Sequence, residues 1–183
     1  GESLLSIDTE TKIATTTKRR IRFDHLISSM PFVRLMDSIG QSWDSDTFSW
    51  NKVLVFNLGF DSKGQDKDHW QYIPSRDLCF YRVGFYDNIF GTDRMSLYVE
   101  IGLESDATVG SVDMWLKQVM DDLVSSGIVT NQALVSWHSV LLDPAYVHIA
   151  SSARSEVEST LCALKPKGIH SLGRYGGWTY CAI

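Results

Sequence analysis

The segment VLVFNLGF, residues 53–60, is the stretch of sequence that decides the fold. Its residues are mostly β-branched, aromatic or otherwise apolar, which is the composition of a strand in a well-packed sheet. Further along, SLYVEIGL at residues 96–103 alternates apolar positions with Tyr98 and Glu100. Because the side chains of a strand point to opposite faces in turn, this alternation predicts a second strand with one apolar and one polar face.

A helix is expected after these strands. In residues 112–124 apolar side chains recur every three or four positions, and Gly127 is suited to end the helix. A second helix is expected over residues 152–164, and Lys165 and Pro166 end it. The remaining pattern predicts a hairpin within 4–17, a short helix over 32–39, and short strands near 21–30, 70–74, 78–85, 133–142 and 169–172.

The order of these elements indicates the fold class. Strands come in clusters and helices are few, which predicts an α+β fold with a mainly antiparallel sheet and a few helices covering one face. The chain has 183 residues, of which 44% are hydrophobic, so a real core can form.

Charge and cysteine content exclude several functional classes. The formal net charge is -5, which argues against broad nucleic-acid binding. Cys79, Cys162 and Cys181 are too scattered for a disulfide framework or a zinc site, so we expect no metal. No signal peptide and no apolar run of membrane-spanning length is visible. A cytoplasmic location without a membrane partner is therefore the expectation.

Arginines and tyrosines in strands and loops are the candidate binding residues. Tyr72 and Arg82 flank a bend, Tyr146 follows an Asp-Pro pair, and Arg174 and Tyr180 lie in a glycine-rich tail. Arginine is a bidentate donor suited to phosphate, and a tyrosine hydroxyl adds a neutral donor. The residues alone leave a plainer interpretation open, with surface arginines and tyrosines at the rim of a core. No nucleophile–base pattern stands out, so no catalytic residue is assigned.

Four separated segments occur in the order seen in a known family. They are IRFDHLISSMP at residues 21–31, WQYIP at 70–74 with FYRVGFYDN at 80–88, DPAYVHI at 143–149, and GIHSLGRYGGWTY at 168–180. Together they resemble UDP-galactopyranose mutases and their relatives among the flavin-containing amine oxidases. The third segment lacks both prolines of the family's corresponding loop.

The resemblance implies roles at the matching positions. The substrate-binding residues would be Tyr72, Arg82, Asn88, Tyr146 and Tyr180, of which all but Asn88 would line the pyrophosphate site of a UDP-sugar. The cofactor-binding residues would be Gly173, Arg174, Gly176 and Trp178, with Arg174 beside the flavin. In the family, reduced FAD carries the chemistry at the sugar.

The resemblance also implies how the chain is organised. Residues 1–40 would belong to the sheet of an FAD domain, 41–168 would form the substrate-binding α+β domain, and 169–183 would be a strand returning to the FAD site. The sequence has no G-x-G-x-x-G fingerprint for a dinucleotide. We therefore expect a fragment of a larger flavoprotein, inactive in isolation and binding FAD weakly or not at all.

Three functions stay open from the sequence. The first is a mutase-like flavoprotein with a small-molecule substrate, a UDP-sugar being the first candidate. The second is an FAD-dependent oxidoreductase of the amine-oxidase type acting on another substrate. The third is a non-catalytic binding domain. A homodimer is compatible with each of them.

Overall fold

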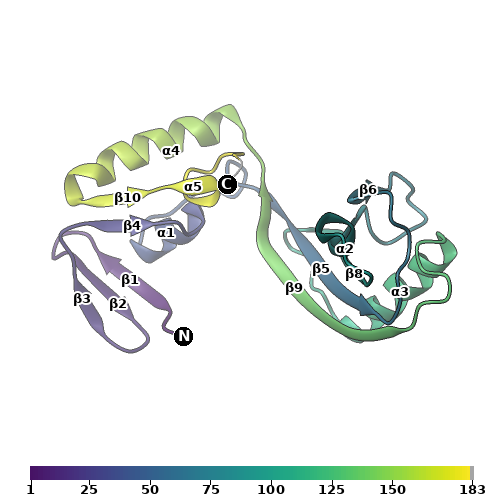
Figure 1. Ribbon diagram of the computed structural model, residues 1–183. Coiled ribbons are helices and arrows are strands. Elements are labelled where there is room, and N and C mark those ends of the chain that lie inside the picture. Colours follow the sequence, from purple (N-terminus) through teal and green to yellow (C-terminus); the bar gives the residue numbers. More distant parts are fainter. Residues whose placement is uncertain (182–183) are drawn as a thin grey trace. The chain divides into compact units, whose positions relative to one another are not determined.

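The structure is a computed structural model that describes residues 1–181, and it divides into two compact units (Figure 1). Unit 1 comprises Gly1–Trp50 and Tyr146–Ile183, and unit 2 comprises Asn51–Ala145. The boundaries between the units thus differ from those expected near residues 40 and 168. Each unit is described by itself.

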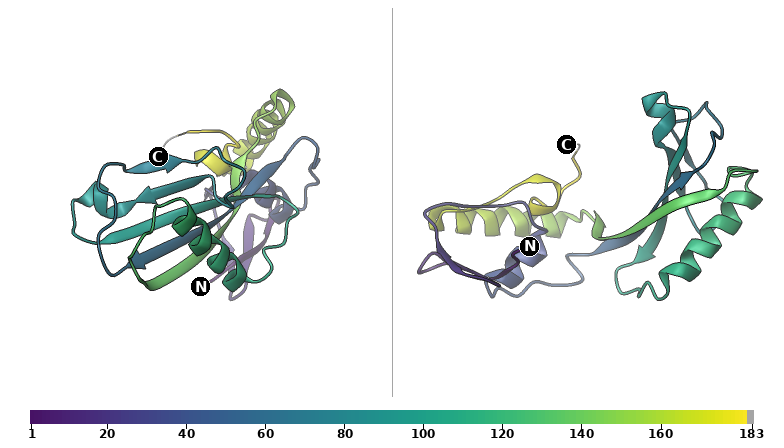
Figure 2. Two further views of the ribbon diagram at one scale, coloured as in Figure 1. Left: turned by 90° about the vertical axis from the view of Figure 1, so that its right-hand side faces the viewer. Right: turned by 60° about the horizontal axis from the view of Figure 1, so that its bottom comes forward.

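Unit 2 is built on a five-stranded sheet whose strand order is β6-β7-β8-β5-β9. β5 pairs antiparallel with β8 from Asn51 opposite Glu104 to Phe60 opposite Met95, and β7 pairs antiparallel with both β6 and β8. Figure 2 shows these strands side by side. The strands are β5 (Trp50–Phe60), β6 (Trp70–Tyr72), β7 (Arg82–Phe85), β8 (Met95–Glu104) and β9 (Leu134–Val147).

Helix α3 (Val112–Ser125) covers one face of this sheet. The Ser111 hydroxyl caps it by accepting a hydrogen bond from the Met114 amide at 3.4 Å. The apolar stripe of the helix packs on alternate residues of β5 and β8. The buried contacts between helix and sheet are made by Val119, Leu123, Leu54, Phe56, Leu58, Leu97, Val99 and Ile101. The α+β class and the mainly antiparallel sheet that the sequence predicts are confirmed.

Three local features of unit 2 differ from the expectation. The strand expected over residues 78–85 begins only at Arg82, because the Cys79 amide donates to the Asp122 carboxylate of α3 at 2.7 Å and not to a neighbouring strand. A short helix, α2 (Tyr86–Phe90), follows β7 directly and was not expected. β9 also runs further than expected, so that Tyr146 lies at the end of a strand.

Unit 1 contains a meander and a parallel strand pair. β1 (Leu4–Asp8), β2 (Ile13–Thr16) and β3 (Arg20–Arg22) form an antiparallel sheet, which confirms the expected hairpin. β4 (Leu26–Ser28) pairs in parallel with β10 (Ile169–Ser171).

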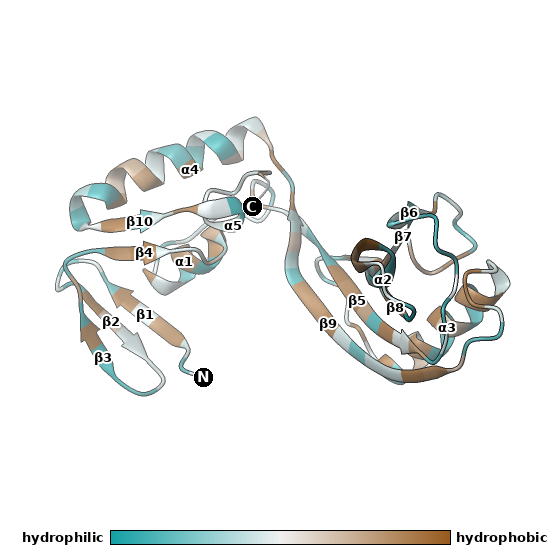
Figure 3. Cartoon of the chain, viewed as in Figure 1, coloured by the Kyte–Doolittle hydropathy of each residue, from teal (hydrophilic) through white to brown (hydrophobic). Residues whose placement is uncertain are grey.

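Three helices complete unit 1: α1 (Phe32–Ser38), α4 (Ser151–Leu164), which continues into the short 3-10 helix η1 (Lys165–Lys167), and α5 (Gly173–Gly176). In Figure 3 hydrophobic and hydrophilic residues alternate along α4, as its half-buried position requires. Phe32, Phe48 and Trp178 are fully or almost fully buried at the centre of this unit.

The glycine-rich tail does not continue as a strand. The strand ends at Ser171, and one helical turn, α5, follows it. Gly173 begins this turn with φ 79°, a left-handed conformation that glycine adopts without strain. Among the residues that the structure describes, no helix is both long enough and apolar enough to cross a lipid bilayer.

Candidate functional site

Arg82 stands at the centre of the first group of predicted site residues. Its Nη1 donates to the Tyr72 hydroxyl at 3.2 Å, and its Nη2 forms an ion pair with the Glu100 carboxylate. The guanidinium carbon lies 5.5 Å from the centre of the Tyr98 ring and 5.7 Å from that of the Tyr72 ring. We call Tyr72, Arg82, Tyr98 and Glu100 the Arg82 cluster. The structure thus brings Tyr72 and Arg82 together, and their role in substrate binding stays a prediction.

The register of the sheet creates the Arg82 cluster. Arg82 on β7 lies opposite both Tyr72 on β6 and Glu100 on β8. The Glu100 side chain is only 10% exposed, against 23% for Arg82. Burial works against the charged form of Arg82, but its hydrogen bonds to Tyr72 and Glu100 prevail and raise the pKa of the guanidinium above its ordinary value. The arginine therefore stays charged at any accessible pH.

Two tyrosines, Tyr81 and the cluster member Tyr98, support the ion pair of Arg82 and Glu100. The Tyr81 hydroxyl donates to the second carboxylate oxygen of Glu100, so the carboxylate is held from two sides. Burial raises the pKa of the Tyr98 hydroxyl, while the positive charge of Arg82 lowers it in part. Tyr98 thus remains a neutral phenol beneath the guanidinium at physiological pH.

Asn88 is held away from the Arg82 cluster by other contacts. Its side-chain amide donates to the carbonyl oxygens of Gln65, at 3.0 Å, and Asp68, at 2.8 Å. These bonds tie α2 to the loop between β5 and β6. The contacts give Asn88 a structural task, and its assignment to substrate binding stays a prediction.

Arg174 is the centre of a second cluster, which lies in unit 1. Its guanidinium carbon is 4.4 Å from the ring centre of Tyr180, 5.1 Å from that of Tyr146 and 5.9 Å from that of Tyr175. A cation over aromatic faces at these distances is attracted by the ring quadrupoles. We call these four residues the Arg174 cluster. It joins Arg174, Tyr146 and Tyr180, three of the residues that the sequence singles out.

The other residues predicted to bind a cofactor differ in accessibility. A β-carbon on Gly173 would meet open space, whereas one on Gly176 would lie 2.6 Å from the Ser171 hydroxyl. Trp178 is 2% exposed, packs edge-on against Phe48, and donates its indole N–H to the His148 carbonyl at 3.3 Å. Packing inside unit 1 thus accounts for Gly176 and Trp178, and their role toward a cofactor stays a prediction.

Each of the two clusters contains one buried hydrogen-bond donor that has no acceptor among the described residues. Within residues 1–181 the Nε atoms of Arg82 and Arg174 are buried and have no hydrogen-bond partner. A buried donor without a partner costs free energy, so such atoms are rare unless a bound group satisfies them. Each of the two arginines thus carries one unsatisfied N–H donor in the described part of the chain. In the same range of residues, no group of three His, Cys, Asp or Glu side chains is arranged to hold a metal ion.

Sequence reasoning missed several residues in these clusters or next to them. Glu100 and Tyr98 were visible only as the polar positions of a strand, and their alternation was the available signal. Tyr81 and Tyr175 adjoin Arg82 and Arg174 in the sequence, but nothing in the sequence alone indicates that Tyr81 reaches across to β8. That contact requires the register of β7 on β8.

The chain thus has an α+β fold with two clusters, in each of which an arginine stacks on tyrosine rings. Solved structures share this fold. A structure of reduced UDP-galactopyranose mutase is similar with a TM-score of 0.83 and 21% sequence identity, over 97% of this chain and 41% of that chain. No protein-family model matches the sequence, and no curated protein matches it either.

Two other solved structures are similar at lower identity. A proposed protoporphyrinogen oxidase from Exiguobacterium sp. 255-15 gives a TM-score of 0.74 at 12% identity, over 95% of this chain and 42% of that one. A CLA-producing fatty acid isomerase from P. acnes gives 0.63 at 13% identity, over 94% of this chain and 42% of that one. The chain therefore spans about two fifths of the length of these proteins. At such identities the likeness establishes the fold.

Proposed function

We propose that this chain is the substrate-facing part of an FAD-dependent flavoprotein resembling UDP-galactopyranose mutase, and that it binds the pyrophosphate of a UDP-sugar next to the flavin. The observation that carries the proposal is the common build of the two clusters. In each, an arginine is stacked on tyrosine rings and keeps a buried Nε without an acceptor among the described residues. Phosphate oxygens are the acceptors that such arginines bind best.

The proposal divides the work between the two clusters. Arg82 would bind the diphosphate, and the Tyr72 hydroxyl beside it is on a side chain that is 63% exposed and so within reach of a ligand. Tyr180, 69% exposed, and Tyr146 would complete the substrate contacts from their own cluster. Orientation and charge neutralisation are what these residues can contribute.

Arg174 is the residue that fits a flavin neighbour. Its Nε has no acceptor among the described residues, and a β-carbon on the preceding Gly173 would meet open space. Reduced FAD would supply the nucleophilic chemistry at the sugar, and the side chains of this chain would bind and orient the substrate. Because the sequence lacks a G-x-G-x-x-G fingerprint, we expect the 183-residue chain to bind FAD weakly or not at all. Stoichiometric flavin absorbance in the purified chain would contradict this expectation.

Two other functions are each favoured by one observation. The fold is shared with a proposed protoporphyrinogen oxidase, which favours an FAD-dependent oxidoreductase of the amine-oxidase type with a substrate other than a UDP-sugar. The ion pair between Arg82 and Glu100 favours a non-catalytic binding domain, because a paired arginine can be purely structural.

Isothermal titration calorimetry of the chain with UDP tests the proposal. We expect UDP to bind and Arg82→Ala to weaken it tenfold or more, roughly the worth of one charged hydrogen bond. Arg76→Ala is the matched control, because Arg76 is an exposed arginine in the loop just before β7. UDP binding that Arg82→Ala leaves unchanged would contradict the assignment of the site. No response to UDP at all would favour the oxidoreductase or the non-catalytic domain.

A further inference from the structure

β9 forms an open edge of the unit 2 sheet (Figure 2). Within residues 1–181 the strand order β6-β7-β8-β5-β9 places β9 at the end of the sheet, next to β5. The outer side of such a strand presents a row of backbone N–H and C=O groups, and another extended strand matches their spacing best. The chemistry of this edge therefore selects an extended polypeptide as its partner.

Two other strand edges of the chain are protected in ways that natural proteins commonly use. β6, at the opposite end of the same sheet, is only three residues long. β3, at one end of the three-stranded sheet of unit 1, carries the exposed Arg20 and Arg22. Short length and charged side chains both keep an edge from pairing with a second chain. β9 has neither protection, because it is 14 residues long and its residues 134–142 include no Asp, Glu, Lys, Arg, Pro or Gly.

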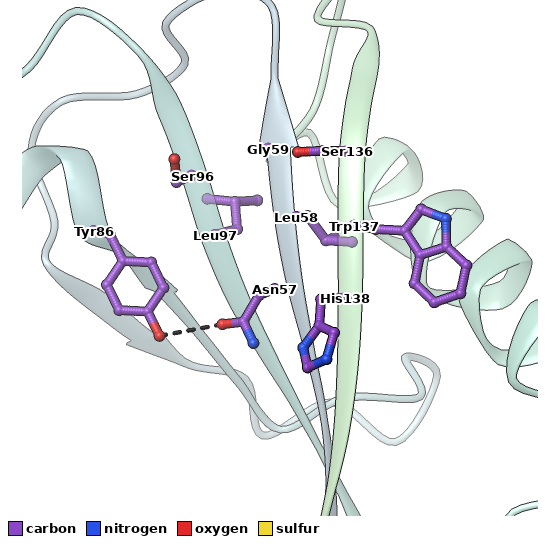
Figure 4. Close-up of a pocket in the computed structure, with 9 residues that line it drawn as sticks. All are labelled: Asn57, Leu58, Gly59, Tyr86, Ser96, Leu97, Ser136, Trp137 and His138. Atoms are coloured by element: carbon purple, nitrogen blue, oxygen red, sulfur yellow. Dashed lines mark hydrogen bonds between the residues drawn. The ribbon is translucent and has the colours of Figure 1, made fainter.

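The same stretch of β9 exposes apolar side chains on both faces of the sheet. In Figure 3 β9 carries hydrophobic segments along its length, and in Figure 4 Trp137 and His138 leave the strand in different directions, as alternation requires. Single exposed apolar residues are ordinary, but here they follow one another closely along one strand. The exposed apolar residues of 134–142 are Val135, Trp137, Val140, Leu141 and Leu142, each between 38% and 64% exposed.

We propose that the outer edge of β9 pairs with β9 of a second copy of this chain, as a symmetric antiparallel strand pair. The lack of charge in 134–142 favours a like copy, because two identical strands then meet without opposing like charges, although each chain has a formal net charge of -5. An acidic or basic partner would find no counter-charge on this stretch. The inference goes beyond the proposed function, because 134–142 contains no residue of the Arg82 cluster or the Arg174 cluster.

The uncharged stretch is self-complementary when its middle residue, His138, lies on the two-fold axis. A symmetric pair brings the same surface of both copies together, and residues directly opposite each other in an antiparallel pair lie on the same face. With His138 opposite itself, positions equally distant from it face each other, and all of 134–142 is paired. The cross-strand pairs are then Leu134 with Leu142, Val135 with Leu141, Ser136 with Val140, and Trp137 with Ser139.

Sedimentation equilibrium of the 183-residue chain, without any ligand, tests the proposal. We expect a monomer–dimer equilibrium with a dissociation constant on the order of 10 µM, because one strand pair lies at the small end of protein–protein interfaces. Hydrogen exchange locates the interface. The amides of residues 134–142 should exchange more slowly well above that concentration than well below it, whereas the amides of β6, the other edge strand, should exchange equally fast at both.

Charge variants at His138 test the register. His138→Lys and His138→Asp each place two like charges opposite each other across the two-fold axis, so each should weaken self-association roughly tenfold or more. A mixture of the two variants should associate again, because the mixed dimer brings opposite charges together at the same place. Mixing would not reverse damage to the fold. His138 is exposed, so both variants should unfold in urea as the wild type does.

Met114→Lys is the matched control, because it places the same charge on α3, at a side chain that is 74% exposed and lies outside β9. It should leave the dissociation constant of the dimer unchanged.

Three results would each overturn the proposal. The first is a chain that stays monomeric up to about 200 µM, which leaves β9 to solvent or to a different segment. The second is self-association that the His138 variants do not weaken. The third is hydrogen exchange in 134–142 that does not depend on concentration. UDP takes no part in these measurements, so they are independent of the function proposed above.

Discussion

Tyr98 lies directly over Gly84, its partner across β7 and β8, so that a β-carbon on Gly84 would lie 1.9 Å from the Tyr98 ring. The bare glycine is what lets the ring lie flat against the sheet under the Arg82 guanidinium. Gly84→Ala should therefore displace Tyr98 and lower the free energy of unfolding by about 1–3 kcal/mol. Urea unfolding of the purified variant measures the loss.

Gly102→Ala is the matched control for that prediction. Gly102 lies on the same strand as Tyr98, and a β-carbon there would meet the Tyr81 ring at 3.8 Å, an ordinary van der Waals distance. We expect this variant to be as stable as the wild type or nearly so. Equal destabilisation by both substitutions would show that alanine destabilises these strands in general, and that the close packing of Tyr98 on Gly84 is not the cause.

Arg82 and Glu100 should be strongly coupled in stability. Removing either partner leaves the other charge largely buried without its counter-ion, which costs about 3 kcal/mol in comparable pairs. A double-mutant cycle with Arg82→Ala and Glu100→Gln should give a coupling of roughly 1–3 kcal/mol in urea unfolding. The exposed pair Lys117 and Asp121 on α3 serves as the control and should couple by less than about 0.5 kcal/mol. Equal coupling in the two pairs would mean that burial adds nothing at Arg82.

The fold was largely predictable because its strong signals are local. The alternation around Tyr98 and the periodic apolar residues of 112–124 each report on one element, and both were confirmed. α2 could not be predicted, because it is five residues long and lacks a side-chain cap. The strand expected from residue 78 begins only at Arg82, and the Cys79 amide donates instead to Asp122, which is 43 residues away in the sequence.

The candidate site was predictable only in part, for a related physical reason. Arginine and tyrosine can be recognised as residue types, but their partners depend on strand register. Glu100 is 18 residues from Arg82 and reaches it because the two face each other across β7 and β8. A pocket lined by Asn57, Ser136 and His138 among others depends on the three adjacent strands β8, β5 and β9, and no local sequence pattern indicates it (Figure 4).

Asp8 should make the stability of the chain depend on pH. Its carboxylate accepts the backbone amides of Thr11 and Glu10, both at 2.9 Å, in the turn after β1. These bonds, led by that of Thr11, favour the charged form and lower the pKa of Asp8. A lowered pKa in the folded state means that the stabilisation is complete above the unfolded value, about 3.9, and is lost as the pH falls through the folded value.

The Asp8→Asn variant tests this dependence. Its melting temperature should lie below that of the wild type at neutral pH, and the difference should shrink as the pH falls below about 4, because the wild type then loses the same contribution. Thermal melting curves, monitored by circular dichroism over this pH range, measure the difference in melting temperature. A gap that stays constant with pH would show that the charge of Asp8 does not contribute.

Cys79 should resist alkylation much more than an ordinary thiol. Burial raises its pKa to about 12, and the hydrogen bond and negative charge of Asp122 add to the effect. At pH 8 the thiolate fraction should be on the order of a thousandfold below that of an ordinary cysteine, since only the thiolate reacts. Mass spectrometry after iodoacetamide treatment should find Cys162 and Cys181, both exposed, modified well before Cys79. Asp122→Asn should speed Cys79 labelling several-fold while leaving it the slowest of the three, because burial is the larger cause. Labelling of Cys79 at the rate of the exposed cysteines would show that the loop before β7 is not held against α3 in solution.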